Sequence, residues 1–292
     1  MFLFSLFFII MKIYNLQNGR LGNSIFKYLA SVVLCILYDG EIMENDNEIN
    51  YHIDDNFFNH FMNENLQGNY FFIDKNANYR MNGYCQHDEI YKKYKKEIID
   101  YIEKHPNDLL ITDGNDENEN RYHFKKQIYK SSDIIYSTHN IKKYDIAVHL
   151  RMEDFINYGF VIHPKSMMNV LEKIGKKEIC IVMNEPKLEI ETKYINYLKK
   201  YFTLTIESND VVTDYHIMKN ANILVCQCST VAWAAALMSE TISEVYLPNY
   251  KNKPQHKDRY WETFSKPIEN TILYDYEICS KNELEDFLNS EI

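Results

Sequence analysis

A histidine and an arginine end an apolar segment near the middle of the chain, in the order His149-Leu150-Arg151, and Asp154 follows three residues later. The preceding residues 146–148 are typical of a buried strand, and open α/β sheets bind ligands where such strands end. Arginine is scarce here, with five among 32 basic residues. Its planar, two-pronged cation suits phosphate, so Arg151 is a candidate phosphate ligand that Asp154 would orient. A purely structural ion pair between the two side chains is the alternative.

A second apolar segment, 223–226, is followed by Ser229 and Thr230 and then by a stretch rich in alanine. This pattern indicates a strand that leads into a helix, whose free N–H groups and positive dipole end suit a phosphate. Ser229 as a simple helix cap is the alternative interpretation. The two roles are compatible, because a capping hydroxyl can also face a ligand.

A third segment, Gly19-Arg20-Leu21-Gly22-Asn23, separates an expected strand at 13–16 from an expected helix at 24–34 that Asn23 would cap. Two glycines in such a turn let the backbone come close to a ligand. The segment lacks the GxGxxG spacing of a dinucleotide loop and the Lys-Ser/Thr ending of a phosphate-binding P-loop. By itself it is equally consistent with a ligand loop and with an ordinary tight turn.

These residues need a scaffold, and the hydrophobic pattern from residue 144 onward predicts one. Short apolar runs alternate with amphipathic stretches, which indicates βαβ units and a parallel, doubly wound sheet. We expect strands at 145–149, 178–183, 203–207, 223–226 and 244–247, and helices at 165–174, 189–201, 211–219 and 230–238. Residues 40 to 140 are less periodic and carry one clear helix at 91–104, so they complete an irregular N-terminal domain. The expected division is an apolar tail at 1–10, an N-terminal α/β domain at 11–143 and a C-terminal domain at 144–292.

Composition sets further limits. With 292 residues, 46% of them apolar, the chain can bury a substantial core. A net charge of −10 and the lack of a basic block beyond 92–96 argue against a general nucleic-acid binder. The six cysteines are dispersed and indicate neither a disulfide framework nor a zinc site, so we expect a reducing compartment.

The apolar start of the chain, residues 1–10, has no basic region before it and no cleavage site of small residues. It is about half as long as a membrane-spanning helix. We therefore expect a loose tail, or a translation start at Met11, rather than a membrane anchor. This supports a cytoplasmic location or a peripheral one on a membrane, with only weak support for membrane association.

Together the three segments resemble the GDP-fucose-dependent fucosyltransferases, particularly the α-1,2-fucosyltransferases of glycosyltransferase family 11. That family has a Gly-x-Leu-Gly-Asn start, an HxRxGD element and a late Ser-Thr/Ser-Phe-Ser-Trp-Trp element. Here the corresponding segments are 19–28, 149–154 and 229–233, in the same order. The sequence departs from the family pattern at four positions, which are Ser24 for glutamine, Glu153 for glycine, Cys228 for asparagine and Ala234 for the second tryptophan.

The resemblance implies a GT-B-like fold, in which two Rossmann-type domains face a cleft, the N-terminal one on the acceptor side and the C-terminal one holding the nucleotide sugar. It implies that Arg151 grips the diphosphate and stabilises the leaving group, with His149 beside it, and that Ser229 and Thr230 bind the β-phosphate. Asp214 would accept hydrogen bonds from guanine N1 and N2. The cleft wall opposite the nucleotide would be formed by Gly19, Arg20, Gly22 and Asn23.

The implied reaction is inverting transfer of fucose from GDP-fucose to a glycan hydroxyl. Such transfer requires a partly freed acceptor hydroxyl and a neutralised diphosphate. Candidates for the base are Asp154 and, in the N-terminal half, Asp54 or Asp55. The chain has no Asp-x-Asp triplet, the metal-chelating motif of GT-A glycosyltransferases, so we expect neither a metal nor another cofactor.

Three alternatives stay open. One is a GT-B transferase that uses a different nucleotide sugar. Another is a relative that binds GDP or a glycan without turnover, because Glu153 adds negative charge near the expected diphosphate. The last is an α/β scaffold without a ligand. The acceptor sugar and the linkage are not specified by the sequence.

Overall fold

The computed structural model describes residues 10–15, 19–44, 49–68, 73–112, 126–137, 139–249 and 266–291. The apolar tail expected at 1–10 therefore lies outside the described residues, apart from Ile10. The described residues form two compact units, which we call unit 1 (10–112 and 126–136) and unit 2 (137–291). The division follows residue 136, whereas the sequence pattern placed it after residue 143.

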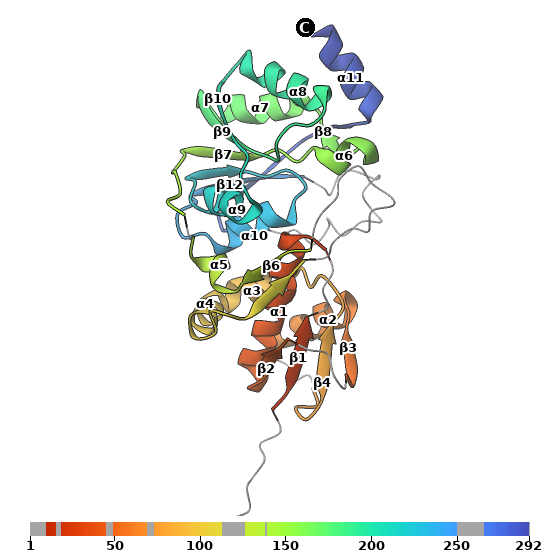
Figure 1. Ribbon diagram of the computed structural model, residues 1–292, viewed down its shortest axis with the longest axis vertical. Helices are drawn as coiled ribbons and strands as arrows, with labels where there is room; N and C mark the ends of the chain where they lie inside the picture. The colour runs from red at the N-terminus through yellow and green to blue at the C-terminus, as the bar shows by residue number, and fades with distance from the viewer. Residues whose placement is uncertain are drawn as a thin grey trace, which may run out of the picture. The chain divides into compact units, whose positions relative to one another are not determined.

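Unit 2 is built on a six-stranded parallel sheet (Figure 1). Its strands are β7 (Ile146–His149), β9 (Glu178–Val182), β10 (Thr203–Glu207), β11 (Ile223–Val225), β12 (Glu244–Pro248) and β13 (Thr271–Tyr274). The order across the sheet is β10-β9-β7-β11-β12-β13. The first strand is central, the next two lie on one side of it and the last three on the other. This is the 3-2-1-4-5-6 order of dinucleotide-binding Rossmann sheets, and it confirms the doubly wound parallel sheet expected for the C-terminal half.

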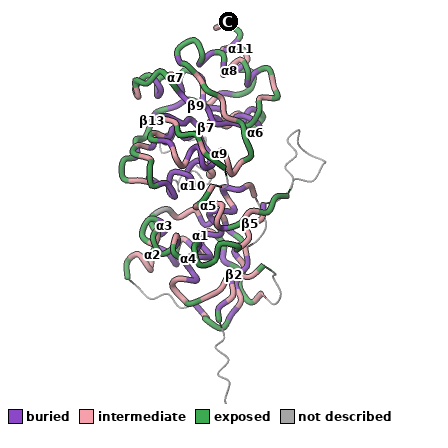
Figure 2. Tube along the Cα trace, turned by 60° about the vertical axis from the view of Figure 1, so that its left-hand side comes forward, coloured by how far each residue is buried: buried purple, intermediate pink, exposed green. Residues whose placement is uncertain are grey.

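Helices cover both faces of this sheet (Figure 1). On one face lie α7 (Pro164–Ile174), α8 (Glu189–Lys199) and α11 (Lys281–Ser290). On the other lie α9 (Val211–Lys219) and α10 (Thr230–Met238), which pack against each other. Strand alternation explains the two layers, because Ile146 and Val148 of β7 pack into the core with α7 and α8 while Ala147 faces the opposite way. Figure 2 shows β7 and β9 largely buried between helices whose outer residues are exposed.

Three short elements complete unit 2. Helix α6 (Glu153–Tyr158) follows β7 almost directly. Strands β8 (Val161–Ile162) and β14 (Ile278–Cys279) form a small antiparallel pair.

Unit 1 contains a second parallel sheet, which the weak periodicity of residues 40–140 did not predict. Its strands β1 (Lys12–Asn15), β2 (Glu41–Met43), β3 (Tyr51–Ile53) and β4 (Asn78–Met81) have the order β2-β1-β4-β3. The helices are α1 (Leu21–Tyr38), α2 (Asp55–Leu66), α3 (Asp88–Lys93), α4 (Lys95–Lys104) and α5 (Ser132–Ile135). Strands β5 (Leu109–Ile111) and β6 (Ile128–Lys130) form an antiparallel pair.

Two sequence-based expectations for unit 1 were wrong in detail. Helix α1 begins at Leu21 with Arg20 at the N-cap, so Asn23 lies inside the helix and is not its cap. The reason is Gly19, whose φ of +83° turns the chain directly into the helix. The expected single helix at 91–104 is broken at Tyr94, whose backbone is not helical. The two halves, α3 and α4, each pack against α1, and the break lies within the lysine-rich run.

Helix α1 is apolar and, with 18 residues, long enough to cross a membrane. However, 78% of this apolar stretch is buried inside the protein. The helix is therefore the central core helix of unit 1, packed against β1, β2 and α4.

Candidate functional site

Two of the three sequence segments meet at one edge of the unit 2 sheet. Strand β7 ends at His149 and β11 ends at Val225, and these neighbouring strands are paired in register with Val148 opposite Val225. The strand order reverses between them, and open α/β sheets bind ligands at the carboxyl ends of strands at such a point. The residues that follow β7 and β11 therefore emerge at the expected ligand edge.

Gln227 connects the two segments directly. Its side-chain oxygen accepts a hydrogen bond from the backbone N–H of Arg151 at 2.8 Å. The residue is 2% exposed, and its Nε2 atom has no hydrogen-bond partner in the part of the chain that the structure describes. Because Oε1 must be the acceptor for the N–H of Arg151, the free donor is assigned to Nε2. A buried donor of this kind costs about 1–3 kcal/mol unless something satisfies it.

Gln227 was not among the residues that the sequence pattern indicated. The available signal was a single amide in an otherwise apolar or small run, 223–228, at the end of an expected buried strand. That signal does not reveal the partner, which is 76 residues away in the chain.

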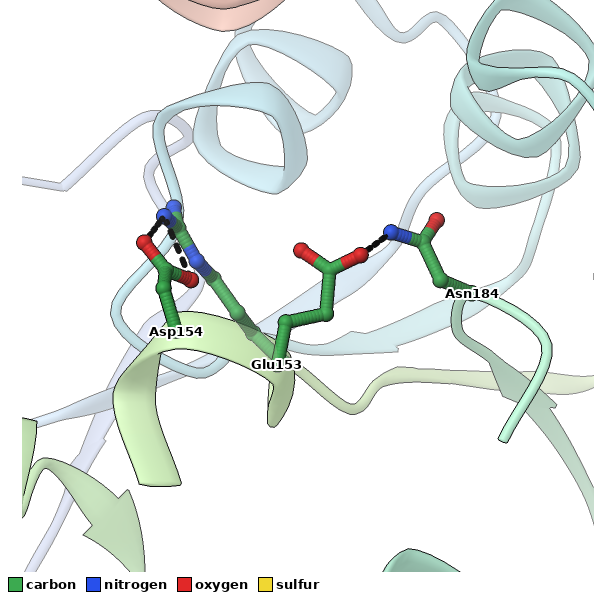
Figure 3. Close-up of polar contacts among 4 residues, drawn as sticks. Glu153, Asp154 and Asn184 are labelled. Atoms are coloured by element: carbon green, nitrogen blue, oxygen red, sulfur yellow. Dashed lines mark hydrogen bonds and ion pairs between the residues drawn. The ribbon is translucent and has the colours of Figure 1, made fainter. Parts of the chain in front are cut away.

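Arg151 is held by side chains of α6, the helix that begins two residues later. Its Nη2 atom lies 3.1 Å from Oδ2 of Asp154, an ion pair marked by dashed lines in Figure 3. Its guanidinium carbon lies 4.2 Å from the centre of the Phe155 ring. The side chains of Arg151 and Asp154 are 18% and 24% exposed, so neither is removed from solvent. The expected pairing of Arg151 with Asp154 is confirmed. The contacts hold the guanidinium in one orientation, which is what a bidentate phosphate ligand requires.

Glu153 has a strained backbone and an almost buried side chain. Its φ is +27°, in the left-handed region that favours glycine, and it is 9% exposed. Figure 3 shows its carboxylate directed to Asn184, whose side-chain amide donates to Oε1. The neighbouring Asp154 instead accepts from Nη2 of Arg151. Glu153 occupies the position where the HxRxGD pattern has glycine. A left-handed backbone at this position is a physical reason for glycine in the pattern. The present chain adopts the same conformation with glutamate.

His149 ends β7 with its Nδ1 atom buried and without a hydrogen-bond partner among the described residues. Burial, together with the positive charge of Arg151, lowers the pKa of His149 to about 3. The imidazole is therefore neutral at physiological pH. It can offer a hydrogen bond to a ligand but no positive charge, so Arg151 is the cation at the end of β7.

Ser229 occupies the N-cap position of α10, but its hydroxyl makes no capping hydrogen bond. The residue is 3% exposed, and its backbone N–H is donated to the carbonyl oxygen of Gln227 at 2.7 Å. Thr230, the first residue of α10, is partly exposed. The N-terminus of α10 thus lies next to Gln227 with a serine hydroxyl that the helix itself does not use.

Asp214 lies in α9, which follows β10 and packs beside α10. Its Oδ1 atom accepts from both the backbone N–H and the side-chain amide of Asn209, each at 3.1 Å. Burial raises the pKa of Asp214 to about 6, although the Asn209 hydrogen bonds oppose the shift. A carboxylate at this position is costly for the protein and is the group expected to recognise guanine.

The remaining candidates lie in unit 1. Gly19, Arg20, Gly22 and Asn23 form the turn into α1 and its first residues. The two proposed bases there both have structural partners. Asp54 caps α2 by accepting from the N–H of Phe57 at 2.8 Å, and Asp55 accepts from the N–H of Cys85 at 2.6 Å.

Among the described residues, no group of three or more His, Cys, Asp or Glu side chains is arranged to hold a metal ion. All six cysteines are buried free thiols.

No protein-family model matches this chain, and no curated protein matches it. Its structure is similar to that of POFUT1 in complex with GDP-fucose, with a TM-score of 0.42 and 8% identity over 82% of this chain and 97% of that one. A structure of POFUT1 in complex with GDP gives 0.42 and 9% over 82% and 98%. A mutant of Arabidopsis thaliana FUT1 in complex with GDP gives 0.42 and 10% over 82% and 70%. A likeness of this degree assigns neither a family nor a function.

Proposed function

We propose that the protein is a glycosyltransferase that binds a nucleoside diphosphate sugar at the carboxyl edge of the unit 2 sheet and transfers the sugar to a glycan hydroxyl. The observation that carries the proposal is the meeting of Arg151 and the N-terminus of α10 where the 3-2-1-4-5-6 strand order reverses. A cation with a fixed orientation and a helix N-terminus are both suited to a diphosphate.

The chemistry of this edge matches the demands of the leaving group. Breaking the bond between the sugar and the diphosphate places negative charge on the phosphate oxygens, and fixed donors stabilise that charge most effectively. Arg151 supplies the charge, while the N–H groups of α10 and the Ser229 hydroxyl supply further donors. A phosphate oxygen would also give the unsatisfied Nε2 of Gln227 an acceptor.

We further propose GDP-fucose as the donor, with inverting transfer and an α-1,2 type of linkage. The support is the resemblance of segments 19–28, 149–154 and 229–233 to the α-1,2-fucosyltransferases. The carboxylate of Asp214 adds chemical support, because guanine presents paired N–H donors that adenine lacks. In this proposal the acceptor is bound by unit 1, the fold is GT-B-like, and Asp154 is the base candidate in unit 2.

We propose metal-independent transfer, because Arg151 and the α10 N-terminus can take over the neutralising role of a cation. A nucleotide screen tests donor choice and metal dependence together. GDP and GDP-fucose should raise the melting temperature with and without EDTA, since a ligand at 100 times its Kd adds about 2.7 kcal/mol of stability. UDP and ADP should give much smaller shifts. Equal shifts for GDP and UDP would contradict guanine recognition, and a GDP shift that disappears in EDTA and returns with manganese would contradict metal independence.

Substitution of Arg151 tests the site itself. Arg151→Lys keeps the positive charge but loses the paired N–H donors of the guanidinium. This should lower kcat/KM by about 10- to 150-fold, equivalent to roughly 1.5–3 kcal/mol. Arg151→Ala should lower it further and weaken GDP binding. Arg80→Lys in unit 1 is the matched control and should change neither quantity.

A structural ion pair between Arg151 and Asp154 has different consequences. Both Arg151 variants would then melt at lower temperature without ligand, while GDP affinity would stay unchanged. Unchanged GDP binding by a stably folded Arg151→Ala protein would end the diphosphate proposal.

A GDP-binding protein without turnover is the second candidate, and Glu153 is the observation that favours it. Its carboxylate is almost buried two residues from Arg151, where added negative charge opposes a diphosphate. A clear GDP shift with no transfer of fucose to any glycan acceptor would favour this function over the transferase.

A further inference from the structure

Unit 1 contains a pocket of about 100 Å³ at the carboxyl ends of β1 and β2, lined also by α1 and β5. One buried water needs roughly 10–15 Å³ on this scale, so the pocket has room for a small organic molecule. None of the residues that line it belongs to unit 2, so it shares no residue with the proposed nucleotide site.

Two planar polar side chains in the pocket are each fixed through one atom. The side-chain oxygen of Asn15 accepts from the Ser31 hydroxyl at 2.6 Å. The other branch of the Asn15 amide is therefore Nδ2, which is a donor. The Oδ2 atom of Asp108 accepts from the Tyr28 hydroxyl at 3.0 Å. Among the described residues, Tyr28 is the side-chain partner of this carboxylate, so Oδ1 is left to accept from a ligand. The protein thus positions an amide donor and a carboxylate acceptor and leaves both with hydrogen-bonding capacity.

The charges at the pocket restrict the class of ligand. Two carboxylates, Asp108 and Glu44, and one cation, the buried Lys27, line it. Repulsion between the carboxylates contributes to the raised pKa of Asp108, behind burial as the main cause. Because the carboxylates outnumber the cation, an anion is disfavoured. A multivalent metal is disfavoured too, because no group of three suitable ligands exists among the described residues. Hydroxyl groups both donate and accept, so neighbouring hydroxyls of a neutral polyol match the Asn15 and Asp108 pair.

Part of the pocket wall is apolar. Ile42, Met43 and Leu110 line it beside the polar groups. A pyranose ring has the same division, with hydroxyl groups at its edge and C–H groups on its faces. Apolar lining with a few placed polar groups is the usual composition of small-molecule sites.

We propose that this pocket binds one neutral, polyhydroxylated ring of monosaccharide size, with Asp108 accepting from one hydroxyl and Asn15 donating to another. The assignment of that ring to the glycan acceptor rests on the proposed transferase function. The existence of the pocket and its preference for hydroxyl groups do not.

Saturation-transfer NMR on the full chain without nucleotide tests the proposal, with galactose, glucose and N-acetylglucosamine as sugar probes and methylammonium and inorganic phosphate as charged probes. At least one sugar should receive saturation, and the charged probes should not displace it. Asp108→Asn keeps an acceptor for Tyr28 but replaces the charged oxygen, and should weaken sugar binding by at least 10-fold. Asn15→Asp keeps the acceptor for Ser31 but removes the donor, and should do the same. Asp100→Asn, an exposed unit 1 position in α4, is the matched control and should bind as the wild type does.

Absence of saturation on all three sugars would overturn the proposal, as would equal sugar binding by Asp108→Asn and Asp100→Asn proteins with wild-type circular dichroism. Displacement by methylammonium or by phosphate would also overturn it. A separate GDP thermal shift on the same samples distinguishes the two ideas. Sugar binding without a GDP shift contradicts the nucleotide site alone, and a GDP shift without sugar binding contradicts the pocket alone.

Discussion

Two buried side chains at the carboxyl edge of the unit 2 sheet have a polar atom without a partner among the described residues. Gln227 holds the backbone of Arg151 with its oxygen and leaves its amide donor unsatisfied. His149, at the end of the neighbouring strand β7, has an unsatisfied Nδ1 atom. Buried polar atoms without partners are rare in native proteins, and a functional site is one recognised reason for them. Two such residues on adjacent strand ends therefore favour a ligand over a purely structural arrangement.

Asp214 should stabilise a ligand and destabilise the empty protein. Because its pKa is raised to about 6 in the folded protein, its contribution to the free energy of unfolding falls as pH rises from about 4 to 6. Asp214→Asn removes this penalty while Asn209 keeps an acceptor. Urea unfolding at pH 7.5 should show a gain of roughly 2 kcal/mol, with no gain at pH 4. The variant should also bind GDP and ADP with more similar affinities. A less stable variant at pH 7.5, or an unchanged preference for GDP, would contradict these roles.

At Glu153, the glycine variant should be more stable than the alanine variant, the reverse of the usual order within a helix. At a φ of +27°, glycine is free of the Cβ strain that other residues incur, which costs roughly 1–2 kcal/mol. Both Glu153→Ala and Glu153→Gly lose the contact with Asn184. The difference between their free energies of unfolding therefore reports the cost of the backbone conformation alone. Glu153→Gly should be the more stable by about 1 kcal/mol in urea unfolding. At Glu172, an exposed position within α7, glycine should instead be less stable than alanine by a similar amount. The same order at both positions would contradict the strain.

At the scale of single elements, the ends of β7 and β11 and the start of α10 act together. The strands bring Arg151 and Gln227 within hydrogen-bonding distance, and Gln227 is followed two residues later by the N-cap of α10. Helix α10 has nine residues, and none of its first-turn residues is acidic. Its positive end therefore has no internal anion, and an added phosphate would be stabilised by the dipole.

The two serine caps of unit 2 provide a matched pair of variants. Ser280 caps α11 by accepting from the N–H of Glu283 in a reciprocal capping box, so Ser280→Ala should lower the free energy of unfolding by about 1 kcal/mol and leave GDP affinity unchanged. Ser229→Ala removes no capping bond, so stability should change by less than about 0.5 kcal/mol. Its GDP affinity should fall by at least about 10-fold, as expected for a hydrogen bond to a charged group. Loss of stability without loss of GDP affinity in Ser229→Ala would show that Ser229 is a plain cap.

On the scale of the whole molecule, the chain comprises two α/β units, each with its own parallel sheet. The long apolar helix α1 forms the core of unit 1, and the six-stranded sheet forms the core of unit 2. The proposed nucleotide site and the polyol pocket lie at the carboxyl edges of these two different sheets. Each can therefore be tested without disturbing the residues of the other.

The pH dependence of stability should contain two opposing contributions from unit 2. His149 has a pKa lowered to about 3 and so stays neutral in the folded protein. Its contribution to the free energy of unfolding is therefore lost as pH falls below about 6.5, the pKa of a histidine in the unfolded chain. Asp214 acts in the opposite direction between about pH 6 and 4. His149→Asn removes the first contribution. Relative to wild type, the variant should therefore gain about 2 kcal/mol in the free energy of unfolding between pH 6.5 and pH 5. A stability difference that is constant over this range would show that His149 is not held neutral.

Local sequence patterns predicted much of unit 2. The helices at 211–219 and 230–238 and the strand at 203–207 have the bounds that their periodicity indicated. The pairing of Arg151 with Asp154 was also predictable, because three residues along one turn bring the side chains together. Strand β13 and helix α11 were not anticipated. Of the unit 1 sheet, whose strands have only three or four residues, the sequence pattern predicted β1 alone. Segments this short carry too few side chains to establish a period.

Sequence alone determined which residues carry charge, which runs are apolar and where strands give way to helices, since these depend on neighbours within a few positions. The tertiary structure decided which strand ends meet, and hence that Arg151 and Gln227, 76 residues apart, share a hydrogen bond. It also decided that Ser229 leaves its cap unmade, that Glu153 adopts a left-handed backbone and that Asn15 and Asp108 share one pocket. Strand order and burial result from packing between distant segments, and neither leaves a periodic trace in the local sequence.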